Sequence, residues 1–273
     1  MKNRAGQLAA GIVLVALVAL TLYPFVFMLQ KSVQSNVQIA GNFWGLQFPL
    51  QWRYYASAWS TVWPLVFNSV KVSALTVAGV LVLSSMSAFC FARYRFVGKN
   101  VIYYCVLGLL MVPDVLTLVT RFILVRDLGL LDTHAALILP GIATLQVVAI
   151  FILRGFFETL PEELFESARI DGASEWTVYC RLALPMSLPI LATVGVLTLL
   201  AVWNDYIWPL VTLDDPSRFT IPLGLADLEN LSTRLQVGEQ MAGYVLGSLP
   251  LLVVFFLAMR TFLRGFTAGA IKG

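Results

Sequence analysis

The chain has 273 residues, of which 59% are hydrophobic and only 12% are charged, and its mean hydropathy is +0.83. Soluble domains carry about 25% charged residues. A water-soluble globule is excluded, because too few polar side chains are available to cover this much apolar area. The net charge of +3 gives no support to nucleic-acid binding.

Six stretches are long and apolar enough to cross a bilayer, which takes about 20 residues of helix. In chain order they run over residues 8–30, 72–92, 100–120, 135–153, 182–204 and 240–259. Proline interrupts the third, fifth and sixth stretches, where neighbouring helices can satisfy the freed carbonyl groups. The sequence therefore predicts an all-α polytopic membrane protein with six transmembrane helices.

Basic residues predict the orientation. With the N-terminus inside, 11 of the 18 Lys and Arg residues face the cytoplasm together with 6 of the 15 acidic residues, which gives the inner side a net charge of +5. Loops rich in Lys and Arg stay on the cytoplasmic side, so both termini are expected there. The first stretch exceeds the roughly 7–15 apolar residues of a signal peptide, and we interpret it as an uncleaved span.

Two of the segments expected outside the membrane are long enough to interpret. In residues 31–64, aromatic side chains recur at helical spacing at Trp52, Tyr55, Trp59 and Trp63. This pattern predicts one face of a helix at the membrane interface, either as an aromatic belt or as a contact with an external binding protein. The second segment, residues 212–238, carries charged side chains of both signs.

Catalytic and metal-binding patterns are absent from the sequence. The single histidine, His134, cannot build a zinc site or a His–Ser pair, and we interpret it as a polar residue at the outer end of the fourth span. Gly98-Lys99-Asn100 matches only the end of a phosphate-binding loop, with Arg93 where the first glycine belongs. We predict a non-enzymatic chain without metal or cofactor, so that any ATP must be bound by another subunit.

The cytoplasmic connection at residues 156–185 has the most informative pattern. Thr159 and Glu162 predict a T-x-x-E capping box for a short helix that begins near Leu160. Gly172 is placed to end this helix in the left-handed conformation, and Ser174 can cap a second short helix. The expected structure is a compact helix–turn–helix on the cytoplasmic face.

Small and charged residues cluster at the turn of this segment. Small side chains let another backbone approach closely, and flanking charges suit docking to a soluble partner; a solvated linker is the alternative. The residues concerned are Glu166, Ser167, Ala168, Arg169, Asp171, Gly172 and Ala173.

The same segment resembles the E-A-A…D-G-A…L-P motif of the permease subunits of ATP-binding-cassette (ABC) importers. The matching residues are Glu166, Ser167, Ala168, Asp171, Gly172, Ala173, Leu184 and Pro185, with Ser167 in place of alanine. Further segments are similar to carbohydrate-uptake permeases of the maltose and glycerol-phosphate type: Asn68-Ser69, residues 111–113, 136–140 and 203–210, and the tail at 265–273.

This resemblance implies a type I importer transmembrane domain at residues 65–264, preceded by a first helix and external segment (1–64) and followed by a cytoplasmic tail (265–273). Residues 156–185, named the coupling loop below, are then expected to dock on an ATPase, and residues 212–238 to probe the ligand cleft of a binding protein. The implied partners are a second homologous permease, two ATPase subunits that bind ATP, an extracytoplasmic solute-binding protein and a sugar. The implied location is a bacterial or archaeal cytoplasmic membrane.

Three residues at the end of the fifth stretch are candidates for a substrate pathway. Asn204 and Asp205 can hydrogen-bond sugar hydroxyls, and Trp203 offers a flat apolar face to a sugar ring. A polar pair at membrane depth is costly unless it faces protein or water. Alternatively, Asn204 and Asp205 cap or cross-link helices.

Two other classes of membrane protein remain open at this point. A stand-alone secondary transporter or channel would explain the spans, but it predicts internal repeats or chains of buried ionisable groups. The sequence shows neither, and Asp114 and Asp205 are the only acidic candidates for ion coupling. A membrane scaffold is the third class.

Overall fold

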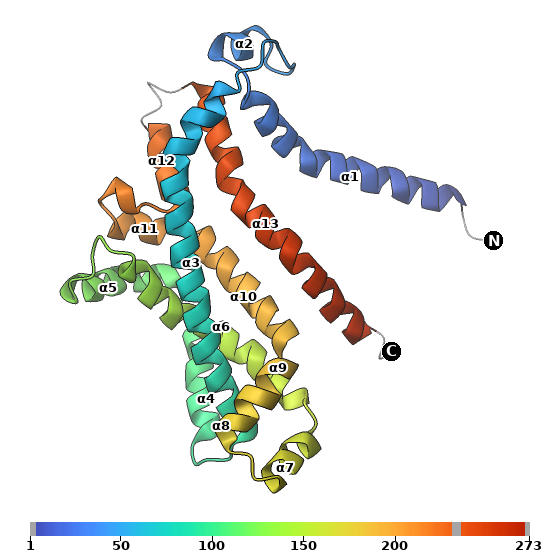
Figure 1. Cartoon of the computed structure of the whole chain (residues 1–273), viewed down its shortest axis with the longest axis vertical. Helices are drawn as coiled ribbons and strands as arrows, with labels where there is room; N and C mark the ends of the chain where they lie inside the picture. Colours follow the sequence, from blue (N-terminus) through green and yellow to red (C-terminus); the bar gives the residue numbers. More distant parts are fainter. Residues whose placement is uncertain (1–3, 231–235, 271–273) are drawn as a thin grey trace. The chain divides into compact units, whose positions relative to one another are not determined.

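The computed structural model describes residues 4–230 and 236–270, with side chains described for residues 6–228 and 236–256. All regular structure in these residues is helical (Figure 1), as the sequence predicts. The helices divide into two compact units. Unit 1 comprises residues 1–66 and 224–251, and unit 2 comprises residues 67–223 and 252–273.

Unit 1 contains α1 (Arg4–Lys31), α2 (Asn36–Gly41), the start of α3 (Arg53–Arg93), most of α12 (Ile221–Asn230) and the start of α13 (Val237–Ala270). Lys31, at the end of α1, is buried, and its Nζ donates to Gln34 Oε1 at 2.9 Å. The ammonium also lies over the rings of Phe27 and Phe43, 5.3 and 5.4 Å from their centroids. Cation–π contacts of this kind offset part of the cost of removing a charge from water.

The start of α3 differs from the sequence prediction. The aromatic residues of the outer segment were expected on a separate interfacial helix, but α3 runs without a break from Arg53 through the second span. One face packs against α13 through Tyr54, Ala58 and Ala242. Trp59 and Trp63 stack at 5.0 Å and stay half exposed. The predicted domain boundary between residues 64 and 65 lies inside this helix and stays a prediction.

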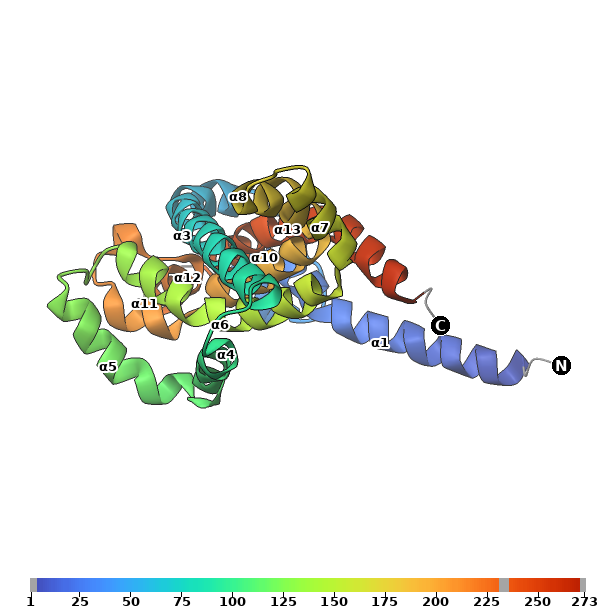
Figure 2. The ribbon, with the colours of Figure 1, turned by 90° about the horizontal axis from the view of Figure 1, so that it is seen from below.

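Unit 2 contains the remaining helices and the end of α3. Its elements are α4 (Lys99–Gly108), η1 (Leu109–Met111), α5 (Asp114–Asp127), α6 (Ala135–Thr159), α7 (Glu162–Ile170), α8 (Glu175–Val178), η2 (Tyr179–Ala183), α9 (Leu184–Met186), α10 (Leu188–Trp203), α11 (Ile207–Thr212) and η3 (Pro216–Arg218). The η2 element is a five-residue π turn. Figure 2 shows α4 beside α6.

Two pairs of helices are sharply bent. The helices before and after Pro113 differ in direction by 101°, and those before and after Ser187 by 76°. Proline lacks a backbone N–H group, and the third stretch is bent where the sequence predicts an interruption by proline. This pair of helices is a broken span or a re-entrant loop. By length and composition, the described residues hold four helices able to cross a membrane, or six when each bent pair counts as one. The predicted six agrees with the higher figure.

Small polar residues let α3 and α6 approach closely in unit 2. Ser69, Ser73, Thr76, Ser84 and Ser85 of α3 are all buried. A side chain added at Gly141 of α6 would lie 3.2 Å from Thr76. Membrane helices pack through small residues because lipid supplies no hydrophobic drive to join them. Gly141 therefore lets α6 approach α3 closely at Thr76.

Candidate functional site

The turn between α7 and α8 has the hydrogen bonds of a Schellman motif. The Ala173 amide donates to the carbonyl of Ala168 at 3.0 Å, and the Gly172 amide donates to that of Arg169 at 3.0 Å. Gly172 has φ +79°, which L side chains rarely adopt. Ser174 then accepts from the Thr177 amide at 3.2 Å and caps α8. The predicted left-handed glycine and serine cap are both confirmed.

The predicted capping box at the start of α7 is wrong. The Thr159 hydroxyl donates back to the carbonyl of Phe156 at 2.7 Å and does not reach the first turn of α7. Pro161 holds the N-cap position without a side-chain hydrogen bond. Glu162 forms an ion pair with Arg93 at the end of α3. A tertiary contact therefore replaces the local cap.

Arg93 ties the coupling loop to the rest of unit 2. Its Nη2 donates to the carbonyls of Phe157 and Leu160 at 2.6 and 2.7 Å, which satisfies carbonyl groups at the end of α6 that lack helical partners. Its guanidinium lies 4.1 Å from the centroid of the Phe165 ring. One side chain thus joins α3, the end of α6 and α7.

A dense apolar core lies beneath the coupling loop. Phe165 of α7 and Phe157 of α6 are both fully buried, and each packs against Phe89 of α3. Tyr179 of the π turn also contacts Phe89, and its hydroxyl lies 2.7 Å from Ser85 Oγ. Each fully buried ring stabilises this arrangement by roughly 2–3 kcal/mol. The loop is therefore a packed part of unit 2.

A small ion-pair network closes the two short helices on each other. Arg169 Nε donates to Glu175 Oε1 at 2.9 Å, and the Tyr94 hydroxyl donates to Glu175 Oε2 at 2.9 Å. The hydrogen bond from Arg169 holds the pKa of Glu175 below its usual value of 4.5. Desolvation, together with the bond to Glu175, raises the pKa of Tyr94 to about 12, so the phenol stays protonated and donates throughout the physiological range.

The outward face of the coupling loop is apolar at its centre. Leu164, Ile170 and Trp176 are 38%, 86% and 62% exposed. Glu166 and Asp171, two of the predicted motif residues, are exposed and form no side-chain hydrogen bond or ion pair with the described residues. Exposed apolar groups rimmed by charges are typical of a protein–protein contact surface. Leu184 and Pro185 lie in α9 at the base of the loop.

A polar cavity lies elsewhere in unit 2, bordered by α3, α5, α6, α10 and α11. Its volume is about 330 Å³, at the lower end of the roughly 300–1,000 Å³ of small-molecule sites. Asp114, Arg121, Thr144, Asp205 and Trp208 line it among apolar neighbours. The two acidic residues singled out in the sequence therefore share one cavity.

Arg121 and Trp208 both line this cavity and contact each other. The guanidinium of Arg121 lies 4.3 Å from the Trp208 ring centroid, and Arg121 Nε is buried without a hydrogen-bond partner among the described residues. The Trp208 indole donates to the carbonyl of Ala136 at 2.8 Å, which fixes the ring. The sequence prediction missed Arg121, although it follows Asp114 by seven residues and so lies on the same face of α5.

The three predicted pathway residues are not equivalent. Asp205 lines the cavity and its Oδ1 accepts from the Trp208 amide at 3.2 Å, which caps the start of α11. Asn204 is the C-cap of α10, and its Nδ2 donates to the carbonyl of Leu200 at 2.8 Å. Trp203 is buried and does not line the cavity. Capping therefore occurs at both polar residues, and a pathway role stays a prediction, centred on Asp205.

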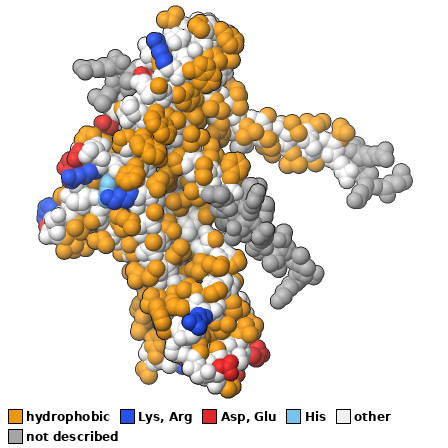
Figure 3. Space-filling model, in the orientation of Figure 1, with side chains coloured by type: hydrophobic (Ala, Val, Ile, Leu, Met, Phe, Trp, Pro, Cys, Tyr) orange, Lys and Arg blue, Asp and Glu red, His pale blue; other side chains and the backbone are white. Residues whose placement is uncertain are grey.

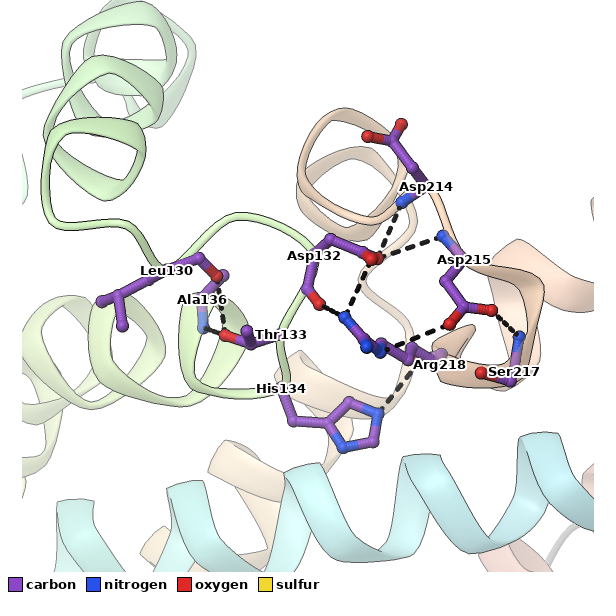
Figure 4. Close-up of polar contacts among 9 residues, drawn as sticks. All are labelled: Leu130, Asp132, Thr133, His134, Ala136, Asp214, Asp215, Ser217 and Arg218. Atoms are coloured by element: carbon purple, nitrogen blue, oxygen red, sulfur yellow. Dashed lines mark hydrogen bonds and ion pairs between the residues drawn. The ribbon is translucent and has the colours of Figure 1, made fainter.

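A second polar cluster joins the α5–α6 turn to the segment after α11 (Figure 4). Asp132 Oδ1 accepts from the amides of Asp214 and Asp215 at 3.1 and 3.0 Å, and Oδ2 accepts from Arg218 at 2.8 Å. Asp132 has φ +55°, a conformation that aspartate tolerates better than most residues. We name Asp132, Asp214, Asp215 and Arg218 the Asp132 latch.

Contacts with α3 and the helix α12 restrict much of the predicted outer loop at residues 212–238. Asn68 of α3 donates to the carbonyls of Ser217 and Phe219 at 2.8 and 3.0 Å. The Ser69 hydroxyl accepts from the Ile221 amide at 2.8 Å. Residues 221–230 then form α12, so most of the expected loop is helical or held by α3. Arg234 and the tail residues 271–273 lie outside the described residues.

Charged side chains of unit 2 gather at two places on the face shown in Figure 3, near the coupling loop and near the Asp132 latch, with hydrophobic side chains between them. This distribution fits a membrane-embedded body with polar ends.

Comparisons with known proteins agree with this arrangement. Residues 80–267 match the family described as the binding-protein-dependent transport system inner membrane component. A probable ABC transporter permease protein of Bacillus subtilis, YurM, is 33% identical over 92% of the chain and 84% of the relative. The arabinooligosaccharides transport system permease protein AraQ of Halalkalibacterium halodurans is 36% identical over 77% of the chain and 75% of the relative. The diacetylchitobiose uptake system permease protein NgcG of Streptomyces coelicolor is 30% identical over 93% and 85%.

A solved structure shares the fold. One chain of a bacterial ABC transporter involved in the import of the acidic polysaccharide alginate superposes with a TM-score of 0.80, covering 95% of this chain and 97% of that chain. At 19% identity, this likeness concerns the fold and not the substrate.

Proposed function

Because the chain belongs to the family of binding-protein-dependent transport system inner membrane components, we propose that it is the transmembrane permease subunit of an ABC importer for a sugar or sugar-like solute. Relatives named for arabinooligosaccharides and for diacetylchitobiose support this substrate class. The family match supports an importer subunit over a stand-alone transporter or channel.

The coupling loop is the observation that carries the proposal. It presents Glu166 and Asp171 without hydrogen-bond or ion-pair partners among the described residues, beside the exposed side chains of Ile170 and Trp176. Its base is fixed by the buried ring of Phe165. A rigid base with an unsatisfied outer face transmits force better than a free linker, because movement of the partner is not absorbed by the loop.

The mechanism follows from the contrast between the packed base of the coupling loop and its unpaired outer face. ATP is bound and hydrolysed by two separate ATPase subunits, and this chain contributes no catalytic group. Closure of the ATPases moves the coupling loop, and the loop moves α3 and α6 through Arg93 and Phe165. The helices then alternate between inward-open and outward-open packing. Such coupling requires contacts that differ between the two states.

The proposed assembly contains a second homologous permease and an extracytoplasmic solute-binding protein. Both termini of the chain face the cytoplasm of a bacterial or archaeal cell, as the basic residues predict. In this orientation the coupling loop is cytoplasmic and the Asp132 latch lies on the side of the binding protein. The segment held by the latch is then available to meet that protein.

The polar cavity supports a route for an uncharged polyol. Asp114, Asp205 and Arg121 provide hydrogen-bond groups of both signs, and the fixed ring of Trp208 offers an apolar face for a sugar. Asp205→Asn keeps the cap on α11 through the amide oxygen while it removes the charge. We expect altered uptake with ATPase stimulation by the loaded binding protein largely kept. Normal uptake would remove Asp205 from the route.

The docking proposal is tested by a charge placed on the outward face of the loop. Ile170→Glu changes a side chain that is 86% exposed, so folding and membrane insertion are retained. We expect loss of co-purification with the ATPase subunits and loss of uptake. Leu128→Glu, at a residue 62% exposed outside the coupling loop, is the matched control and keeps both.

Two results would overturn the proposal. One is wild-type uptake by Ile170→Glu. The other is sugar uptake by the purified chain alone in vesicles without ATPase subunits, which would establish a stand-alone transporter.

A further inference from the structure

A basic cavity of about 450 Å³ lies in unit 2 at the start of α4, separate from the polar cavity and from the outward face of the coupling loop. Arg95, Lys99 and Arg154 line it. Glu158 is the acidic residue paired with one of these cations, Arg154. The cavity therefore has an excess of positive charge. The Gly98-Lys99-Asn100 stretch, whose resemblance to a phosphate-binding loop was incomplete, also lines it.

The three cations keep donors available to a ligand. Arg95 is exposed and forms no hydrogen bond or ion pair with the residues that the structure describes. Lys99 Nζ donates one bond, to the carbonyl of Tyr94 at 3.0 Å, and an ammonium has three protons to donate. Arg154 donates through Nε to Glu158 at 2.8 Å, and its terminal nitrogens have no hydrogen-bond acceptor among the described residues.

Arg154 is also held in a fixed orientation. Its side chain is only 16% exposed, and its guanidinium lies 3.7 Å from the centroid of the Tyr103 ring. A guanidinium fixed by stacking loses little conformational entropy when it binds an anion. Arg and Lys together favour a phosphate group, which accepts several hydrogen bonds at once.

An aromatic groove of about 380 Å³ adjoins the basic cavity and shares Arg154 with it. Tyr103 and Tyr104 of α4 and Phe151 and Ile152 of α6 line this groove. The two tyrosines lie one helical turn after Lys99 on α4, and Phe151 and Ile152 lie about one turn before Arg154 on α6. With the cytoplasmic end of the bundle at Lys99 and Thr159, the groove therefore points towards the bilayer interior.

We propose that the basic cavity and the aromatic groove bind one anionic phospholipid of the cytoplasmic leaflet, with its phosphate in the cavity and the start of an acyl chain in the groove. The inference rests on the membrane orientation given under Proposed function. The neighbouring side chains of Phe96 and Val97 are 43% and 101% exposed, which suits immersion at the interface. Basic pockets between helices on the cytoplasmic side are known sites for anionic headgroups.

The site is connected to the coupling loop by a short path. Lys99 binds the carbonyl of Tyr94, and the Tyr94 hydroxyl binds Glu175 in the coupling loop. A lipid phosphate that holds Lys99 and Arg95 would fix the turn at residues 94–98 and so favour one position of Glu175. The bound lipid is thus expected to raise ATPase stimulation as well as to stabilise the chain.

The test uses the transporter complex extracted from membranes and reconstituted in nanodiscs of phosphatidylcholine with or without phosphatidylglycerol. Native mass spectrometry counts the phosphatidylglycerol retained on this chain, and this count does not require transport. Removing one basic side chain should weaken retention about fivefold, so Arg95→Gln with Lys99→Gln should weaken it about 25-fold. Both side chains lie away from the apolar core, so the double variant folds.

Arg126→Gln is the matched control. Arg126 is an exposed arginine on α5 whose side chain pairs with the adjacent Asp127, and its replacement should leave retention unchanged. Equal retention by the double variant and the wild type, or an equal loss in Arg126→Gln, would overturn the proposal. Complete displacement of the lipid by millimolar inorganic phosphate would also overturn it, because it would assign the cavity to a free anion.

A failure of the proposed function would give a different experimental result from a failure of the lipid site. If the chain does not assemble with ATPase subunits, lipid retention can still be counted on the extracted chain. Retention without assembly would leave the lipid site in place and overturn the importer assignment.

Discussion

The coupling loop and the Asp132 latch close two ends of unit 2 by different physical means. Beneath the coupling loop, Phe157 and Phe165 are fully buried in an apolar core. In the latch, the paired side chains of Asp132 and Arg218 are 31% and 42% exposed, and the contacts are hydrogen bonds, mostly to backbone. Moving the coupling loop away would expose its whole apolar core to water, which is costly. The partly exposed hydrogen bonds of the latch can be replaced by hydrogen bonds to water at little cost.

This difference suits the two proposed roles. A loop that transmits force from an ATPase must move with the helices behind it, and a dense core makes it do so. A segment that meets a binding protein must adjust as that protein docks and leaves, and polar contacts permit this. Mutations should therefore have larger effects at the coupling loop than at the latch.

The largest effect is expected from Phe165→Ala. Removal of a fully buried ring leaves a cavity and costs about 3–5 kcal/mol. The coupling loop should detach from unit 2, which limited proteolysis would detect as new cleavage within residues 160–175, together with loss of uptake. Leu164→Ala, at the adjacent residue with 38% exposure, is the control and should leave the cleavage pattern unchanged. A protected loop in Phe165→Ala would mean that the core does not hold it.

Gly172→Val should have the next largest effect. A Cβ atom at this position meets no atom within 4 Å, so the main penalty comes from the φ of +79° and amounts to about 1–2 kcal/mol. We expect the Schellman turn to open and uptake to fall while membrane insertion is retained. Gly172→Asn should recover most of the uptake, because asparagine tolerates this conformation. If both variants transport normally, the shape of this turn is not needed for coupling.

Asp132→Ala should have a smaller and more local effect. The substitution removes the acceptor for the amides of Asp214 and Asp215, and it places alanine at a positive φ. Hydrogen exchange of these two amides should become faster, while the coupling loop exchanges as in the wild type. Asp127→Ala, which removes an exposed carboxylate paired with neighbouring Arg126, should change neither region. Faster exchange in the coupling loop would contradict the independence of the two ends.

The smallest effect is expected from pH. Arg169 lowers the pKa of Glu175 below 4.5, so the charged form is favoured in the folded protein. The stabilisation is complete above pH 4.5 and is lost as the pH falls through the lowered pKa. Proteolytic protection of the α7–α8 turn should decrease in that acidic range and not between pH 6 and about 8, within roughly the usual stability range of proteins. Glu175→Gln should abolish the dependence, and Glu166→Gln should leave it unchanged.

Local backbone chemistry made part of the coupling loop predictable. Gly172 and Ser174 act within a few residues of themselves, so their roles follow from the sequence alone. The cap at Thr159 was mispredicted because α6 extends to Thr159 and Pro161 holds the N-cap position of α7. Glu162 instead pairs with Arg93, which precedes it by 69 residues in the chain. The local T-x-x-E pattern is therefore not used, and Glu162 forms a tertiary ion pair that the spacing of the sequence does not reveal.

The spans also show the difference between features that the sequence predicts and features that depend on tertiary structure. Their apolar composition identifies the membrane segments, but charge does not mark where a helix ends. The second span was expected to begin at residue 72, yet α3 begins at Arg53 and continues without a break into that span. Likewise, Asp114 and Asp205 were visible in the sequence as isolated acids. They share one cavity with Arg121 and Trp208, and this arrangement follows from tertiary packing, which the sequence does not show.

The π turn at Tyr179–Ala183 has a consequence for the engineering of hybrid permeases. Each residue of an α-helix advances the chain by about 100° around the axis. Deleting one residue from this turn would restore the α-helical repeat and rotate everything on its N-terminal side, Trp176 included, by about that angle relative to α10. A graft that exchanges residues 160–175 alone would keep the angle of the recipient chain, whereas a graft that extends to Met186 would carry the donor's angle with it. Chimaeras that differ only in this boundary should therefore accept different ATPases.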